Sequence, residues 1–203
     1  MDYRETLRFY LEDLSSGKPA PGGGSASALV SAISSALILM VTNFTLGKDE
    51  FREVEDEVRR IYEEAEKIKK DCLQLVDEDV KAYQEYVKAR RLPRGSEEEK
   101  KIRKEKMAQA LEKAAQVPLR IMRKAVRLLQ LNQNLMDKSN PRLRSDVYVS
   151  IEFAWAGLLS AKYNVEVNLP YLEEKKEVLE KEMRRLTQEG EKIYNTLKES
   201  FSL

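Results

Sequence analysis

One carboxylate stands out in this sequence because it interrupts an apolar helical stripe. Apolar residues recur at alternating spacings of three and four from Phe51 to Leu75, and Asp79 occupies the next position. This rhythm places Asp79 on the inward side of a long helix, with Tyr83 one turn further on. A buried carboxylate is costly unless it is paired, protonated or used in chemistry. Asp79 is therefore a candidate acid-base group, and the alternative is a structural salt bridge.

A glycine-rich loop is the second candidate. It runs from Lys18 through two prolines to Gly22, Gly23 and Gly24, and Ser25 then opens an uncharged segment. Backbone N–H groups at the start of a helix could bind an anion or a carbonyl oxygen. No strand precedes the loop and it lacks the lysine of a P-loop, so it is no nucleotide fingerprint. The alternative is a tight turn that lets buried helices cross closely.

Two polar clusters near the C-terminal half complete the candidates. Arg144, Ser145 and Asp146 open an apolar helix, where Ser or Asp is a natural N-cap. Asp146 would instead be a second core carboxylate if it turned inward. Asn164 and Asn168 bracket a short, extended linker after that helix, and asparagines in linkers are usually turn residues.

The composition excludes several kinds of chemistry. The chain has no histidine, which removes Ser-His-Asp and Cys-His nucleophiles and histidine-containing zinc sites. Its one cysteine, Cys72, lies on the apolar stripe and is expected to be an inert core thiol. A formal charge of +1 is not the strong positive charge that is typical of proteins that bind nucleic acid or an anionic membrane. The expected localisation is cytoplasmic, because a single cysteine forms no internal disulfide and the charged N-terminus lacks a signal-peptide pattern.

The element pattern predicts an all-α fold. Helices are expected over residues 2–15, 25–46, 49–91, 96–136, 147–161 and 172–197, with capping boxes at Asp2/Glu5 and Ser96/Glu99. Pro118 is expected to interrupt or restart the fourth helix. The architecture is an elongated bundle of long antiparallel helices, forming one domain over residues 1–203.

The uncharged segment at residues 25–46 has the length of a membrane span. Its serines, Thr42 and Asn43 make it polar for that role, so a buried central helix is the favoured reading. A helical scaffold would explain the long apolar stripe, but neither the glycine loop nor Asp79.

Together these motifs resemble the cyclodeaminase/methenyltetrahydrofolate cyclohydrolase family, which includes the C-terminal half of formiminotransferase-cyclodeaminase. The matching stretches are residues 19–29 (PAPGGGSASAL), 75–87 (LVDEDVKAYQEYV), 91–93 (RLP), 117–119 (VPL), 144–146 (RSD) and 164–169 (NVEVNL). The resemblance implies an all-α homodimer acting on tetrahydrofolate that carries one carbon at N5 or N10. It implies no cofactor beyond that substrate, no metal, no nucleic acid and no membrane.

The resemblance makes the candidates above expected site residues. Asp79 is expected to act as general base and Asp146 to stabilise the cationic carbon. The expected substrate-binding residues are Lys18, Gly22, Gly23, Gly24, Ser25, Asn43, Tyr83, Arg144, Asn164 and Asn168. A chain without a formiminotransferase domain favours the cyclohydrolase, which hydrolyses 5,10-methenyltetrahydrofolate to 10-formyltetrahydrofolate. The alternatives are a cyclodeaminase, which releases ammonia from 5-formiminotetrahydrofolate, and a non-catalytic scaffold.

Overall fold

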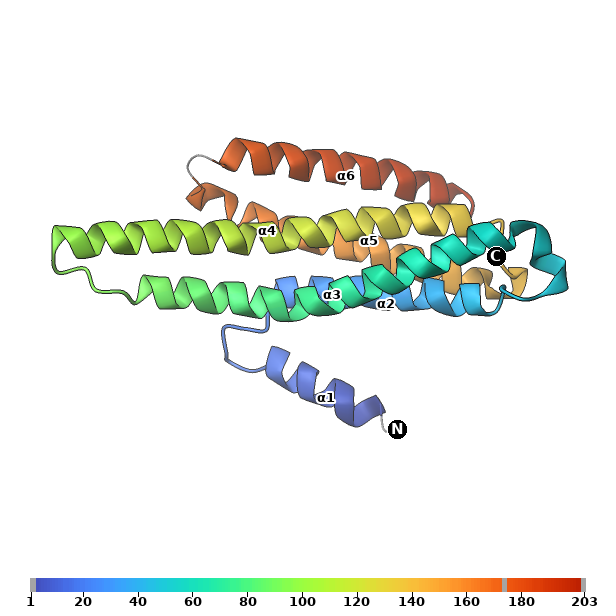
Figure 1. Ribbon diagram of the computed structural model, residues 1–203, viewed down its shortest axis with the longest axis horizontal. Coiled ribbons are helices and arrows are strands. Elements are labelled where there is room, and N and C mark those ends of the chain that lie inside the picture. The colour runs from blue at the N-terminus through green and yellow to red at the C-terminus, as the bar shows by residue number, and fades with distance from the viewer. Residues whose placement is uncertain (1–2, 173–174, 202–203) are drawn as a thin grey trace.

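The computed structural model describes residues 3–172 and 175–201, and this part of the chain contains helices and no strand. Figure 1 shows long helices running side by side, which confirms the predicted elongated all-α bundle. The α-helices are α1 (Tyr3–Leu14), α2 (Gly23–Asn43), α3 (Glu55–Arg90), α4 (Glu97–Leu135), α5 (Arg144–Glu166) and α6 (Lys176–Glu199). Short 3-10 helices cover Asp49–Val54, Pro141–Leu143 and Leu169–Tyr171. The predicted N-terminal cap at Asp2 lies outside the described residues.

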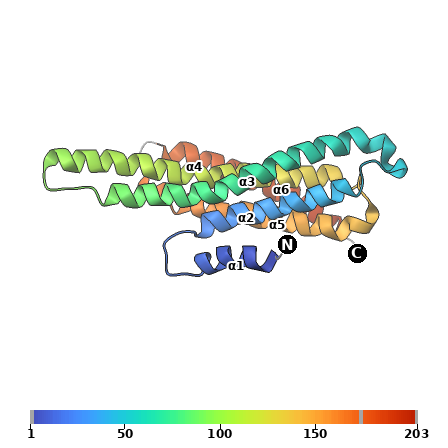
Figure 2. The ribbon, with the colours of Figure 1, turned by 60° about the horizontal axis from the view of Figure 1, so that its bottom comes forward.

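Helix α2 is the central apolar helix that the sequence predicts. It packs against α3, α4 and α5, and Figure 2 shows it between its neighbours. By length and a mean hydropathy of 1.9 it could cross a membrane, but 61% of that window is buried inside the bundle. Small residues let α2 and α5 approach closely. At Gly157 of α5, for example, an added Cβ would lie only 2.3 Å from Oγ of Ser31 on α2. Ser27, Ser31, Ser34 and Ser35 of α2 donate their buried hydroxyls to backbone carbonyls, as Ser35 does to Ala65 at 2.6 Å.

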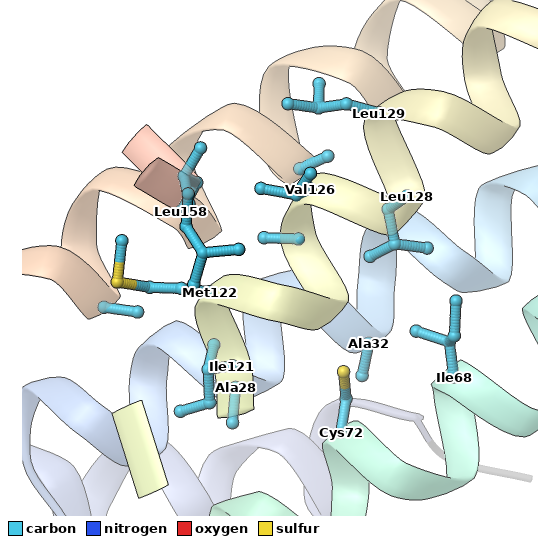
Figure 3. Close-up of a cluster of buried hydrophobic side chains, with 14 of the residues drawn as sticks. Ala28, Ala32, Ile68, Cys72, Ile121, Met122, Val126, Leu128, Leu129 and Leu158 are labelled. Atoms are coloured by element: carbon cyan, nitrogen blue, oxygen red, sulfur yellow. The ribbon is translucent and has the colours of Figure 1, made fainter. Parts of the chain in front are cut away.

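Helices α2 to α6 all contribute to the core. Figure 3 shows Ala32 of α2 beside Cys72 of α3 and below Leu128 of α4, with Leu158 of α5 on the other side of α4. All of these side chains are buried. Burial raises the pKa of the Cys72 thiol to about 12, in keeping with the expected inert core role.

Several helix boundaries differ from the predictions; for example, α2 covers Gly23–Asn43 and α5 begins at Arg144. The helix expected from Asp49 begins as a 3-10 turn and becomes α-helical at Glu55. The linker after α5 is not extended, because α5 continues to Glu166 and a 3-10 turn follows. The last helix begins at Lys176. The Ser96/Glu99 capping box is confirmed, with both reciprocal bonds present.

Pro118 does not interrupt α4, so that prediction is wrong. The helix runs unbroken through it, and Pro118 is buried against the rest of the bundle. Packing on both sides of the proline outweighs its local cost, which is about 3 kcal/mol in a helix interior. Because proline has no N–H, the carbonyl of Ala114 lacks its ordinary intrahelical donor.

Candidate active site

A pocket opens where the start of α2 meets the middle of α3 and α4 and the end of α5. Its volume is about 410 Å³, within the range of small-molecule sites. Asp79 is the one charged residue among those that line it. The lining residues are Pro19, Ala20, Gly22, Gly23, Gly24, Asp79, Ala82, Tyr83, Tyr86, Leu111, Ala114, Pro118, Asn164, Val167, Asn168 and Tyr171.

Asp79 is held by the glycine loop. The backbone N–H of Ser25 donates to Oδ2 of Asp79 at 3.0 Å. A Cβ at Gly24 would lie only 2.0 Å from Oδ1, so the carboxylate can approach the helix terminus only because residue 24 is glycine. The predicted anion site at the start of α2 thus binds a carboxylate of the chain itself. Both interpretations of the loop are partly right. Gly24 permits a close approach, here of the Asp79 carboxylate, and the Ser25 N–H binds that carboxylate as an anion.

The environment of Asp79 favours a proton-accepting role. Burial raises the pKa of this carboxyl, and the Ser25 N–H opposes the rise. Among the described residues Asp79 forms no salt bridge, so the predicted structural alternative is not what the structure shows. A carboxylate with a raised pKa is a stronger base than an exposed aspartate.

Asn164 and Asn168 both line the pocket, and hydrogen bonds fix the orientation of their side-chain amides. Nδ2 of Asn164 donates to the carbonyl of Ser160 at 2.8 Å, and Nδ2 of Asn168 donates to the carbonyl of Asn164 at 2.7 Å. These bonds assign the amide orientations, because a carbonyl can only accept. Each Oδ1 is left as an acceptor, and Asn164 also contacts the glycine loop at the position of Gly23.

The sequence predictions missed several lining residues. Tyr83 was expected, and Tyr86 and Tyr171 add two further rings to the wall. Ala114, whose carbonyl lacks its ordinary intrahelical donor, belongs to the same wall as Pro118. The signal for this feature was present in the sequence as a proline inside a helical pattern.

Two residues of the loop region have other partners than expected. The Ser25 side chain is fully buried and its hydroxyl bonds the hydroxyl of Tyr10 at 3.0 Å, so it does not line the pocket. Lys18 pairs with Asp13 and also lies outside the lining. Ser25 therefore contributes through its backbone N–H, because its hydroxyl is turned toward α1.

The structure places Asn43, Arg144 and Asp146 at the opposite end of the bundle. Asp146 lies in the first turn of α5 and Asn164 near its last, about 27 Å apart at 1.5 Å per residue. Asn43 ends α2, whose first turn is at the pocket. Within one subunit Asp146 cannot share a reacting carbon with Asp79. Its position in the first turn fits the structural alternative, stabilisation of the helix N-terminus.

Comparison with known proteins agrees with the fold and the motifs. A family model described as Formiminotransferase-cyclodeaminase matches residues 6–186. The chain is 36% identical to a methenyltetrahydrofolate cyclohydrolase of Methylorubrum extorquens, over 96% of each chain. It is 29% identical to the formimidoyltransferase-cyclodeaminase of Sus scrofa, covering 80% of this chain but 30% of that protein.

A solved structure agrees as well. The crystal structure of formiminotetrahydrofolate cyclodeaminase from Thermotoga maritima superposes with a TM-score of 0.85 at 28% identity, covering 95% of this chain and 93% of that one. The family match spans nearly the whole bundle, including the glycine loop, Asp79 and both pocket asparagines. The chain therefore belongs to the formiminotransferase-cyclodeaminase family.

Proposed function

We propose that this protein is a one-carbon folate enzyme that hydrolyses 5,10-methenyltetrahydrofolate to 10-formyltetrahydrofolate. The observation that carries the proposal is Asp79, the one charged side chain among the described residues that line the pocket. The methenyl bridge of this substrate is a cation, and a lone carboxylate beside it stabilises the bound ligand. The relative from Methylorubrum extorquens, similar over nearly its whole length, supports the same reaction.

Asp79 supplies the proton transfers that hydrolysis needs. Water adds its oxygen to the bridging carbon while Asp79 accepts one of its protons, giving a neutral tetrahedral carbon. Asp79 then returns that proton to N5 as the bond between carbon and N5 breaks. The new hydroxyl loses its proton to solvent and becomes the formyl oxygen on N10. The reaction consumes one water and releases one proton.

The remaining pocket groups suit a pterin ring. Its edge carries N–H groups, and the pocket offers acceptors at Oδ1 of Asn164, Oδ1 of Asn168 and the carbonyl of Ala114. Tyr83 and Tyr86 provide aromatic surface for stacking against the ring. In this arrangement the asparagines orient the substrate and Asp79 reacts.

Cyclodeamination is the second candidate, favoured by the close structural match to a cyclodeaminase. There N10 attacks the carbon of the protonated N5-formimino group, Asp79 accepts the N10 proton and passes it to the resulting amino group, and ammonia leaves. The product is the same bridged cation, so the same carboxylate serves both reactions. The match to a methenyltetrahydrofolate cyclohydrolase over 96% of each chain favours hydrolysis.

We also propose that the protein acts as a cytoplasmic homodimer. The apolar side chains that remain exposed along α2, just after its end and near the start of α5 support this. Ile33 is 41% exposed, Val149 44% and Phe44 54%. Burying such a surface against a symmetric copy is the commonest way for a soluble chain to cover it.

The test is a spectrophotometric assay of purified protein with 5,10-methenyltetrahydrofolate. Loss of its near-ultraviolet absorbance in proportion to protein, absent in Asp79→Asn, is the expected result. Asp77→Asn is the matched control, because Asp77 is an exposed carboxylate two residues away on α3. Appearance of the same band from 5-formiminotetrahydrofolate, without hydrolysis, would favour the cyclodeaminase. No turnover of either substrate would point to a scaffold.

A further inference from the structure

Helix α1 stands apart from the bundle that the other helices form. Figures 1 and 2 both show it alongside the start of α2 but outside the packed core. No α1 residue belongs to the described hydrophobic core. Its contact with the bundle includes the hydrogen bond between Tyr10 and Ser25.

The helix carries an apolar stripe that the described residues leave largely exposed. Leu7, Leu11 and Leu14 recur at spacings of four and three, so they share one face. Leu7 is 54% exposed and Leu11 56%, and the described residues that line the hollow beside them belong to α1 or, in the case of Ser15, follow it directly. A helix of 12 residues is marginal in water without packing of its apolar face. The stripe therefore needs a partner surface.

The surface that matches it is the exposed apolar face of α2 and α5. This face includes Ile33 and Val149, and α2 carries no charged residue along its length. The Tyr10–Ser25 bond holds α1 with Leu7 and Leu11 exposed, so the stripe does not cover this face in its own chain. In a two-fold dimer the stripe of each chain can pack on the face of the other chain, so both stripes and both faces are covered.

The size of the surfaces also points to a second copy. Two helices about 30 Å long and about 10 Å wide present a footprint of roughly 600 Å². A stable interface needs about 800 Å² on each partner. Helix α1, about 18 Å by 10 Å, adds roughly 180 Å² and brings the total close to that value.

We propose that α1 is an arm that packs Leu7, Leu11 and Leu14 on the α2–α5 face of a second copy of this chain. The proposal rests on the homodimer of the proposed function. The arm leads into the loop that lines the pocket, and Tyr10 bonds the residue whose N–H holds Asp79. Assembly of the dimer thereby fixes one wall of the pocket.

Photo-crosslinking of the full-length protein tests where the arm lies. Benzoylphenylalanine incorporated in place of Leu11 is irradiated in a mixture of ¹⁵N-labelled and unlabelled chains. The expected product has twice the 23.5 kDa mass of one chain and joins α1 of one chain to α2 or α5 of the other. Links confined within single chains, or to other surfaces of the partner, would overturn the proposal.

A pair of variants tests the energetic contribution of the stripe. Leu7→Ser combined with Leu11→Ser is expected to raise the dimer dissociation constant at least about 100-fold, because two arms each lose two buried leucines. Phe9→Ser is the matched control, since Phe9 is equally exposed but points about 200° away from Leu7. Sedimentation equilibrium measures the constant, and circular dichroism checks that the bundle remains folded.

The outcomes separate this proposal from the folate activity. Neither experiment uses a folate, so a dimer joined through α1 supports the arm even if both substrates fail to react. A monomeric wild-type protein would contradict the arm while leaving the folate activity to its own assay. A dimer that is unchanged by the two leucine substitutions would also contradict the arm.

Discussion

A methyl group at Gly24 tests the geometry of the site directly. The Cβ of Gly24→Ala would lie 2.0 Å from Oδ1 of Asp79, whereas ordinary contact begins at 3.4 Å. The carboxylate must therefore retreat by about 3.4 − 2.0 = 1.4 Å, which separates it from the N–H of Ser25. The substitution moves the proposed base without changing its chemistry.

Gly24→Ala is expected to have a small effect on stability and a large effect on activity. Losing a hydrogen bond to a charged group costs about 1.5–3 kcal/mol. Alanine has a higher helix propensity than glycine, which offsets up to about 1 kcal/mol of this loss in stability. The free energy of unfolding should thus fall by only about 0.5–2 kcal/mol, and the protein stays folded. A displacement of about 1 Å in a reacting group costs about 100-fold in rate, so kcat/KM should fall about 100-fold or more.

The assay is hydrolysis of 5,10-methenyltetrahydrofolate, with thermal unfolding measured on the same samples. Gly17→Ala is the control, since a Cβ there meets nothing within 4 Å and Gly17 does not line the pocket. It should retain wild-type turnover. Gly24→Ala with unchanged kcat/KM would refute the reasoning, because a displaced Asp79 could not then be the base.

Three further substitutions extend the tests. Asp79→Asn should melt at or above the wild-type temperature at pH 7, because burial raises the pKa of Asp79. The wild-type protein loses stability as pH rises through that pKa, so the two melting curves should converge in acid. Pro118→Ala should restore a donor to the carbonyl of Ala114 and raise KM about 10-fold without lowering stability, as steady-state kinetics and thermal melts would show. Glu182→Gln should cost about 1 kcal/mol at pH 7 in chemical denaturation. Arg185 lowers the pKa of Glu182 to about 2, so this difference should fade as pH drops from about 4.5 toward 2.

The sequence by itself determined the class of fold and pointed to the carboxylate that we propose as the reacting group. Alternating spacings along residues 51–75 fixed the inward face of α3, and continuing that rhythm identified Asp79 as the acid on it. The uncharged, serine-rich composition of α2 predicted its central place, because small residues permit close helix packing. These are local properties of a helix, and a helix repeats them at every turn.

Which polar groups meet was decided only by the tertiary structure. Asp146 and Asn164 lie on one helix, yet its length puts them at opposite ends of the bundle. Asn164 joins Asp79 because α5 runs antiparallel to α2 and brings its last turns to the glycine loop. The sequence has no local signal for such a pairing, since it depends on helix direction and on where each long helix ends. Pro118 shows the same limit, because packing on both sides kept α4 continuous where local preference alone favours a break.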